Sequence, residues 1–429
     1  MSVDLPPLPQ ELIDNIIDHL HNDNISLLNC ALVCRAWLST SRLHLFAKIH
    51  LHVPLPFIDT PLASRKFSRL LRLLHKHTEL IPHIHELQVH FECGGPNPES
   101  GIFAAGADDT LLPSLLTAFT HVRHFELSSN LSASWDSLPP RVLHAIDTVV
   151  RQPSITYVRL SSWVFDSWKT IASLFRHSQN LRGLALRSTE LGTVNEEQEQ
   201  ELRSGSSGPR LEFLTLDYVD CPDLGSWLSN EHPIMMDLTN IREFRLAHSD
   251  DNCVDRLLRT FGDSLERFHL KPGRIGRKLI NLSSAGLLSL TMSIISVQPM
   301  TLERCARLRS LRLTLDEHPA SLVWVTNVLT SIPVPGILEH VAIEVYIDPK
   351  KLMGWRAIDN ILTRSGAFDS LKEVAIGVFA HPANAEFLKV QEGLAGLKER
   401  GLLRVYQLAT KSQKLCSELT PMISSFEEC

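Results

Sequence analysis

The chain has 429 residues, of which 44% are hydrophobic, and its formal net charge is −6. This length allows a large core or an extended repeat array, and the acidic balance argues against nonspecific nucleic-acid binding as the main task. No apolar run is long enough to predict a membrane span, and the opening Met1–Pro6 lacks the basic and apolar regions of a signal peptide. Eight cysteines, none in a Cys-x-x-Cys pair, fit reduced thiols in a cytoplasmic or nuclear protein.

The first fifty residues carry the patterns of three short helices. Pro9 suits the first helical position, where its missing N–H costs nothing. Apolar residues then recur at helical spacing, with acidic residues between them, at Leu12, Ile13, Ile16, Ile17 and Leu20. A second helix is expected from about Asn24 to Val33 and a third from about Cys34 to Phe46. Helices this short bury little surface by themselves, so the segment needs a partner surface.

This segment resembles the F-box, a three-helix motif that docks onto a Skp-type adaptor. The resemblance rests on a Leu-Pro-x-Glu-Leu opening from Leu8 and a Val-Cys-Arg-x-Trp close from Val33, and it covers roughly residues 5–50. It implies apolar contacts with the adaptor from Leu8, Pro9, Leu12, Ile16, Leu20, Leu28, Val33, Cys34 and Trp37. It also implies a cullin, reached through the adaptor, as a partner. The alternative for these residues is an ordinary helical cap on a solenoid.

After residue 80 one pattern recurs: an apolar residue, two others, an apolar residue, one other, and an apolar residue. The copies begin at Ile84, Val122, Ile155, Leu181, Leu211, Ile241, Leu265, Leu287, Leu308, Leu338 and Leu371. The mean interval is about 29 residues, the upper end of the leucine-rich-repeat range. Most copies follow a helix-like segment, so the pattern predicts one short strand and one helix per turn, with the strands stacked in parallel.

The expected fold class is therefore α/β: a short three-helix F-box followed by an irregular leucine-rich-repeat solenoid with a parallel sheet on its concave face. The repeats resemble the divergent ones of fungal F-box proteins, but only Asn130 matches the consensus asparagine, and the intervals are uneven. The expected boundaries are 1–50 for the F-box, 51–80 for a helical linker, 81–408 for the repeats and 409–429 for a disordered tail. The alternative is a compact α/β domain with a mainly parallel sheet.

Two insertions interrupt the repeats. Residues 93–101 are a loop by composition, and residues 190–210 join an acidic run to a Ser/Gly-rich stretch, which indicates a mobile loop. Near the end of the chain, a helix is expected from about Ala383 to Arg400, ending at Gly401. Residues 402–408 are expected to close the sheet.

No known catalytic constellation is present. The sequence lacks Gly-x-Gly-x-x-Gly, Walker, Gly-x-Ser-x-Gly and His-Glu-x-x-His motifs. Histidines gather between His75 and His90, but their spacing places no convergent set on one helix or strand face. The sequence therefore predicts no enzyme activity, no cofactor and no metal site.

The strand positions between the apolar ones face outward, toward the concave side of a solenoid. Six of them are basic, namely Arg159, Arg187, Arg245, Arg267, Lys271 and Arg312. Acids also occupy such positions, namely Glu86, Glu126, Asp217, Glu243, Glu344 and Glu373, and Asp217 and Glu243 are the ones set against the six basic residues. Because guanidinium groups bind carboxylates and phosphates bidentately, these residues are candidates for binding an acidic or phosphorylated target protein. The alternative is a solvated face with alternating charges.

Together these patterns predict a substrate-recognition subunit of a Skp–cullin–F-box ubiquitin ligase. The F-box would bind the adaptor, and the repeats would bind a target protein and raise its effective concentration near the ubiquitin-loaded enzyme. A scaffold that uses its F-box outside ubiquitin transfer is one alternative, and an enzyme with an unrecognised site is another. The expected location is cytoplasmic and/or nuclear, with neither membrane nor nucleic acid as a partner.

Overall fold

The computed structural model of the chain contains two compact units, the first holding most residues up to Leu211 and the second most residues from Glu212. It describes residues 8–55, 61–93, 111–192, 208–219, 236–247, 251–271, 302–315, 321–333, 337–345, 354–364, 366, 368–378 and 385–408. No helix in these ranges is long and apolar enough to cross a membrane.

The first unit begins with the three helices α1 (Gln10–Asp18), α2 (Asn24–Val33) and α3 (Arg35–Ala47). Their expected boundaries are confirmed to within about two residues. Asp23 caps α2, because its carboxylate accepts hydrogen bonds from the N–H groups of Ile25 and Ser26, both at 3.1 Å. The helices share a small core of Ile13, Ile17 and Leu27, with Leu20, Trp37 and Leu45 packed against it.

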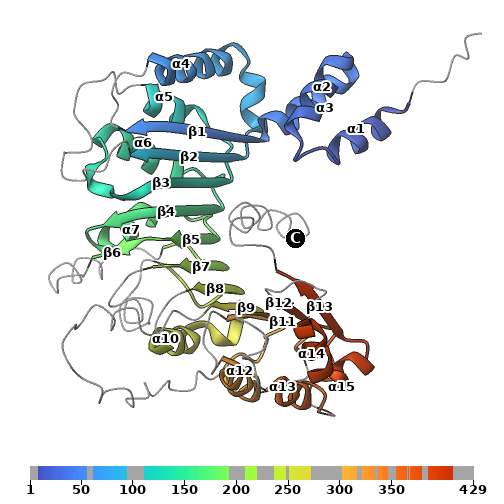
Figure 1. Cartoon of the computed structure of the whole chain (residues 1–429). Coiled ribbons are helices and arrows are strands. Elements are labelled where there is room, and N and C mark those ends of the chain that lie inside the picture. Colours follow the sequence, from blue (N-terminus) through green and yellow to red (C-terminus); the bar gives the residue numbers. More distant parts are fainter. Residues whose placement is uncertain are drawn as a thin grey trace, which may run out of the picture. The chain divides into compact units, whose positions relative to one another are not determined.

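Five parallel strands follow in the first unit and pair in chain order: β1 (Lys48–Leu55), β2 (Glu86–Cys93), β3 (His124–Ser134), β4 (Tyr157–Phe165) and β5 (Gly183–Arg187). The short β6 (Glu190–Leu191) pairs with the end of β4. The helical segments between the strands are α4 (Pro61–Lys76), η1 (Thr78–His83), α5 (Leu111–Ala118), η2 (Trp135–Ser137), α6 (Pro140–Val150) and α7 (Trp168–Phe175). Figure 1 shows β1 to β4 as successive arrows with the same direction.

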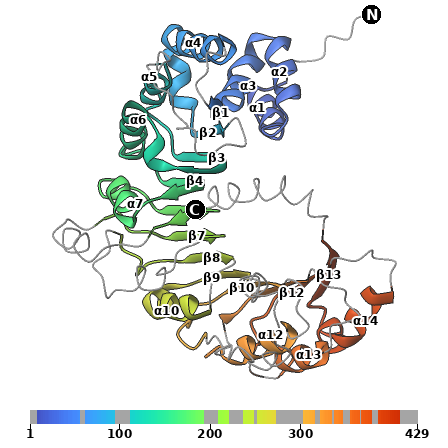
Figure 2. The same ribbon diagram turned by 60° about the vertical axis from the view of Figure 1, so that its left-hand side comes forward.

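The second unit repeats this arrangement. Its parallel strands also pair in chain order: β7 (Phe213–Asp217), β8 (Glu243–Ala247), β9 (Arg267–Lys271), β10 (Ser310–Leu315), β11 (His340–Val345), β12 (Glu373–Val378) and β13 (Leu403–Gln407). Between them lie α10 (Asp251–Phe261), η3 (Gly262–Ser264), α12 (Ser321–Thr330), α13 (Trp355–Leu362), α14 (Ala385–Gly393) and α15 (Ala395–Glu399). Figure 2 shows α12, α13 and α14 in a row along one side of the strands.

Apolar residues from the repeated pattern form the core of each unit. In ten of the eleven copies, the second and third apolar residues lie on a strand and are buried. Neighbouring strands place equivalent residues in register, so that Leu87, Phe125 and Val158 form one buried row. In the second unit the rings of Phe244 and Phe268 stack with centroids 5.7 Å apart. The prediction of an α/β fold with parallel strands is confirmed.

Some sequence predictions differ from the structure or fall outside its described ranges. β1 is a strand where residues 51–80 were expected to form a helical linker, because Ile49, Leu51 and Val53 alternate with polar residues and pair with β2. The eighth copy, from Leu287, lies outside the described residues, and the strands β9 and β10 on either side of it pair directly. Most of the insertions predicted at 93–101 and 190–210, namely 94–101 and 193–207, and the tail from 409 also lie outside them. The start of the second insertion was wrongly expected to be a loop, because Glu190–Leu191 form β6.

Candidate functional site

Large apolar side chains are exposed mainly on the N-terminal helices. Twelve such side chains are exposed in the described part of the chain, and eight of them lie between residues 8 and 43. These eight are Leu8, Leu12, Ile16, Ile25, Leu28, Leu32, Val33 and Leu43. Scattered exposed apolar residues are normal on a protein surface, but a concentration in one short segment of the described chain makes that segment a candidate interaction site.

Helix α1 presents some of its apolar residues outward. Leu12 and Ile16 lie one turn apart on α1, and Leu8 lies just before the helix; these three residues, each about half exposed, are called the α1 strip. Ile13 and Ile17, which lie about 100° further round the helix, fill the small core instead. The apolar face predicted from the sequence is therefore divided between the core and the solvent.

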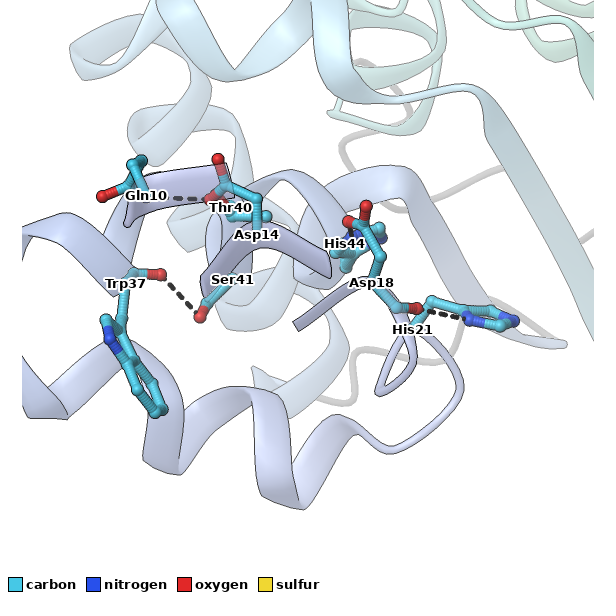
Figure 3. A network of polar contacts seen from close by, with 8 residues as sticks. All are labelled: Gln10, Asp14, Asp18, His21, Trp37, Thr40, Ser41 and His44. Carbon is cyan, nitrogen blue, oxygen red and sulfur yellow. Dashed lines mark hydrogen bonds and ion pairs between the residues drawn. The ribbon is translucent and has the colours of Figure 1, made fainter. Parts of the chain in front are cut away.

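The polar side of α1 faces the protein. Gln10 donates a hydrogen bond to the carbonyl oxygen of Ala36 at 3.1 Å, and Thr40 donates one to Asp14. Asp18 lies 2.7 Å from Nε2 of His44. These three contacts, called the polar ladder, join positions four residues apart on α1 to positions four residues apart on α3. Figure 3 shows the side chains of two of them, Asp14 with Thr40 and Asp18 with His44.

The polar ladder fixes the orientation of α1. Its α1 members lie about 200° round the helix from the α1 strip, because the two sets are offset by two residues. The hydrogen bond from Thr40, followed by that from Gln10, holds the pKa of Asp14 below its ordinary value, so the carboxylate is charged at neutral pH. A helix of a soluble protein normally directs its apolar residues inward, as Ile13 and Ile17 do, so the exposed Leu12 and Ile16 depart from that arrangement.

Helix α2 carries a second exposed strip. Ile25, Leu28 and Leu32 recur at helical spacing, and this α2 strip is 55–85% exposed, while Leu27 and Cys30 on the other side of the helix are buried. Burying half of such a side chain contributes on the order of 1 kcal/mol. The six residues of the two strips would therefore contribute on the order of 5–10 kcal/mol to a complex before the costs of association are subtracted.

The nine predicted adaptor-binding residues divide into two groups. Leu8, Pro9, Leu12, Ile16, Leu28, Val33 and Cys34 are exposed. Leu20 and Trp37 are half-buried and pack against the core of the three helices. A substitution of Trp37 would therefore disturb these helices as well as any interface. Sequence reasoning missed Ile25 and Leu32, although their spacing from Leu28 within the second helix pattern was a usable signal.

The six predicted target-binding residues belong to two separate units. Arg159 lies on β4 and Arg187 on β5, whereas the other four lie on β8, β9 and β10. The guanidinium group of Arg159 is 3.6 Å from the Glu126 carboxylate and 6.0 Å from the centre of the Tyr157 ring, and little of it is exposed. In the first unit, then, this candidate is already occupied by neighbours on its own sheet.

The basic residues of the second unit lie on neighbouring strands. Arg245 and Arg267 both contact Glu243, at 2.8 and 2.9 Å. The ammonium group of Lys271 lies 5.9 Å from the centre of the Tyr218 ring. Arg312 is exposed, and within the described ranges it has neither a hydrogen bond nor an ion pair. These four residues, called the basic face, are the part of the predicted target site that the structure brings together.

The described residues contain no group of three or more His, Cys, Asp or Glu side chains arranged to hold a metal ion. His52 and His90, two of the histidines on neighbouring strands, contact each other edge to face with ring centroids 5.7 Å apart. A search against protein-family models finds no match, and a search of curated proteins finds no significant one.

Proposed function

We propose that the protein is the substrate-recognition subunit of a Skp–cullin–F-box ubiquitin ligase. In this proposal α1, α2 and α3 are an F-box that binds a Skp-type adaptor, and the strand-and-helix turns are divergent leucine-rich repeats that bind the target. The observation that carries the proposal is the outward orientation of the α1 strip, opposite a polar ladder that holds α1 in place.

The composition of the exposed surface favours a protein partner. The two strips carry leucine and isoleucine, which gain free energy when another apolar surface removes them from water. Seven of the nine residues that the F-box resemblance assigns to adaptor contact are exposed. The proposed subunit needs no catalytic residue of its own, because it acts by holding a target near the ubiquitin-loaded enzyme.

The test is adaptor binding by a variant with Leu8→Gln, Leu12→Gln and Ile16→Gln. Glutamine keeps the side-chain length and a good helix propensity, so α1 should still form. We expect the purified variant to lose binding to a Skp-type adaptor by at least about 100-fold, since several central apolar contacts are removed together. Binding would be measured by isothermal titration calorimetry, with circular dichroism as the check on folding.

The matched control replaces exposed apolar residues outside the N-terminal helices. Val323 and Leu388 are 62% and 60% exposed, similar to Leu8 at 56%. The variant Val323→Gln/Leu388→Gln should bind the adaptor like the wild type. Unchanged adaptor binding by the folded triple variant would rule out the F-box assignment. Recovery of the adaptor without a cullin, and without target turnover, would instead favour the scaffold alternative.

A further inference from the structure

The basic face lies on three consecutive strands whose register is known. Arg245 on β8 pairs with His269 on β9, and His269 pairs with Arg312 on β10. The two arginines therefore lie in one row, two strands apart, with a histidine between them. Since neighbouring strands are about 4.8 Å apart, their Cα atoms are separated by about 10 Å.

The charges of this face are only partly balanced within it. Glu243 lies between Arg245 and Arg267, and its carboxylate offsets one of their two positive charges. Its side chain is 12% exposed. Arg312 adds a positive charge with no partner in the described part of the chain, and Lys271, one strand away, adds a positive charge beside the Tyr218 ring. An excess of positive charge on three adjacent strands is unexpected in a chain with a net charge of −6.

A buried hydrogen-bond chain holds the centre of this row in place. Nε2 of His269 lies 3.0 Å from the hydroxyl oxygen of Thr314, and that hydroxyl donates to Glu344, also at 3.0 Å. The phenol of Tyr406 donates to the other oxygen of Glu344 at 3.3 Å. Because the Thr314 proton is used toward Glu344, Nε2 of His269 must carry a proton and donate.

The hydrogen bonds that hold His269 are shielded from water, which distinguishes this surface from a solvated face with mobile side chains. Thr314 is 1% exposed and Glu344 is 9% exposed, so their polar atoms are shielded from water while they hold His269. Buried polar networks of this kind rigidify the groups they contact. His269, at the centre of the row, is therefore preorganised, and preorganisation lowers the cost of ordering a binding site.

We propose that the basic face binds an extended acidic segment of the target protein, with two carboxylates three residues apart. This inference rests on the proposed role of the repeats in target binding. A segment in the extended polyproline-II conformation advances about 3.1 Å per residue with three residues per turn, so such carboxylates lie on one side of it, about 9 Å apart, and match the row across β8, β9 and β10. The segment would cross the strands, with one carboxylate on Arg312 and the other beside Arg245.

Carboxylates fit this face better than phosphates. A phosphoserine carries up to two negative charges and is usually held by two or more converging cations. Here Arg245 and Arg267 already contact Glu243, whose carboxylate would repel a dianion, and Arg312 is the single cation that β10 adds to the row. Single negative charges at the spacing of the row therefore complement it.

The experiment measures binding of fluorescein-labelled peptides to the full chain by fluorescence anisotropy. The probe is a short peptide of Gly, Ser and Thr with two Asp residues three positions apart. Comparison peptides carry adjacent Asp residues, or phosphoserines in place of the spaced Asp residues. We expect the spaced Asp peptide to bind at least about tenfold more tightly than the adjacent one, and to weaken as salt rises.

Variants assign the binding to named residues. Arg312→Gln and Arg312→Glu should weaken the spaced Asp peptide by about 10- to 100-fold, the range for a lost charged hydrogen bond. The matched control is Arg356→Glu on α13, an exposed arginine elsewhere in the same unit. Thr314→Val should weaken binding without changing its salt dependence, and Thr314→Ser should restore it, because Thr314 acts only by positioning His269.

Equal binding of spaced and adjacent Asp peptides, or wild-type affinity in both Arg312 variants, would overturn the inference. Binding of the phosphoserine peptide alone would also overturn it, since the occupant would then be a phosphorylated segment. Adaptor binding, measured on the same preparations, tests the proposed function separately. A chain that binds the spaced peptide but no adaptor would retain this inference and lose the proposed function.

Discussion

The N-terminal helices and the strand-and-helix turns differ in how far their apolar residues are buried. In the turns, equivalent apolar residues such as Leu87, Phe125 and Val158 pair in register and are fully buried. In α1 and α2, two apolar strips are exposed, and α1 turns its polar side toward the protein. The turns bury their apolar residues in their own core, whereas α1 and α2 leave part of theirs exposed.

The comparison also shows where a hydrophobic residue contributes its free energy. A buried residue in the turns stabilises the fold of the chain itself. An exposed residue in the α1 strip contributes little until a partner covers it. Stability measurements and binding measurements should therefore respond to different sets of apolar residues.

The largest effect is expected from Phe125→Ala. Phe125 is fully buried on β3, so truncation should lower the free energy of unfolding by about 3–5 kcal/mol, from lost burial and the cavity left behind. Leu12→Ala on the α1 strip should change it by less than about 1 kcal/mol. Urea unfolding followed by circular dichroism would measure both. Comparable losses of unfolding free energy in the two variants would contradict the distinction between the buried core of the turns and the exposed strip on α1.

A second test compares two cysteines. Cys305 is buried in the second unit, and burial raises the pKa of its thiol to about 12, with the charge of Asp263 adding to the effect. At pH 8 only about one thiol in ten thousand would be ionised, so Cys305 should resist iodoacetamide. Cys34 is exposed where α2 meets α3 and should react. Peptide mapping by mass spectrometry would measure both rates.

The same labelling experiment tests whether an adaptor covers the exposed apolar residues of the N-terminal helices. Addition of a Skp-type adaptor should protect Cys34 and leave Cys305 unchanged. Urea should expose Cys305 and make both thiols reactive. If the adaptor leaves the labelling of Cys34 unchanged, Cys34 is not part of the proposed interface.

The smallest effect concerns Glu86, at the start of β2. Burial alone would raise its pKa, but the hydrogen bond from His124 and the charge of Lys48, 3.4 Å away, outweigh burial and lower the pKa below its ordinary value of 4.5. A lowered pKa in the folded state stabilises the fold above about pH 4.5, and this contribution is lost as pH falls through the folded-state pKa.

Glu86→Gln should therefore lower the melting temperature slightly at pH 7, and the difference from the wild type should shrink as pH falls below about 4.5. Differential scanning fluorimetry across this pH range would measure it. The control is Glu92→Gln, whose side chain is about half exposed and should matter little at any pH. A constant difference between Glu86→Gln and the wild type at all pH values would show that Glu86 acts through packing and not through its charge.

The parallel strands were predictable from the sequence because each copy of the apolar pattern marks the buried side of a strand. Phe244 and Phe268 occupy the middle apolar position of two neighbouring copies, and both strands lie where the pattern placed them. β1 was missed because its pattern, Ile49, Leu51 and Val53, alternates and lacks the three-residue step of the other copies. The expected boundary at residue 50 therefore left Ile49 in the F-box and placed Leu51 and Val53 in a helical linker.

The candidate surfaces were less predictable, because helical periodicity identifies apolar residues without saying which of them find a partner inside the chain. Leu12 and Ile13 are neighbours in one pattern, yet Ile13 is buried and Leu12 is half exposed. The polar ladder decides between them, and it depends on residues of α3 that are 26 positions away. Likewise, the sharing of Glu243 between Arg245 and Arg267 follows from strand register.

The exposed apolar strips of α1 and α2 have a consequence for the amount of this protein in a cell. A chain without its partner displays apolar side chains as a partly unfolded protein does, and chaperones and proteases act on such surfaces. Under the proposed function, the adaptor would cover these strips and remove that signal. The amount of this protein would then follow the supply of its partner, so a cell could set the number of receptors by controlling the adaptor alone.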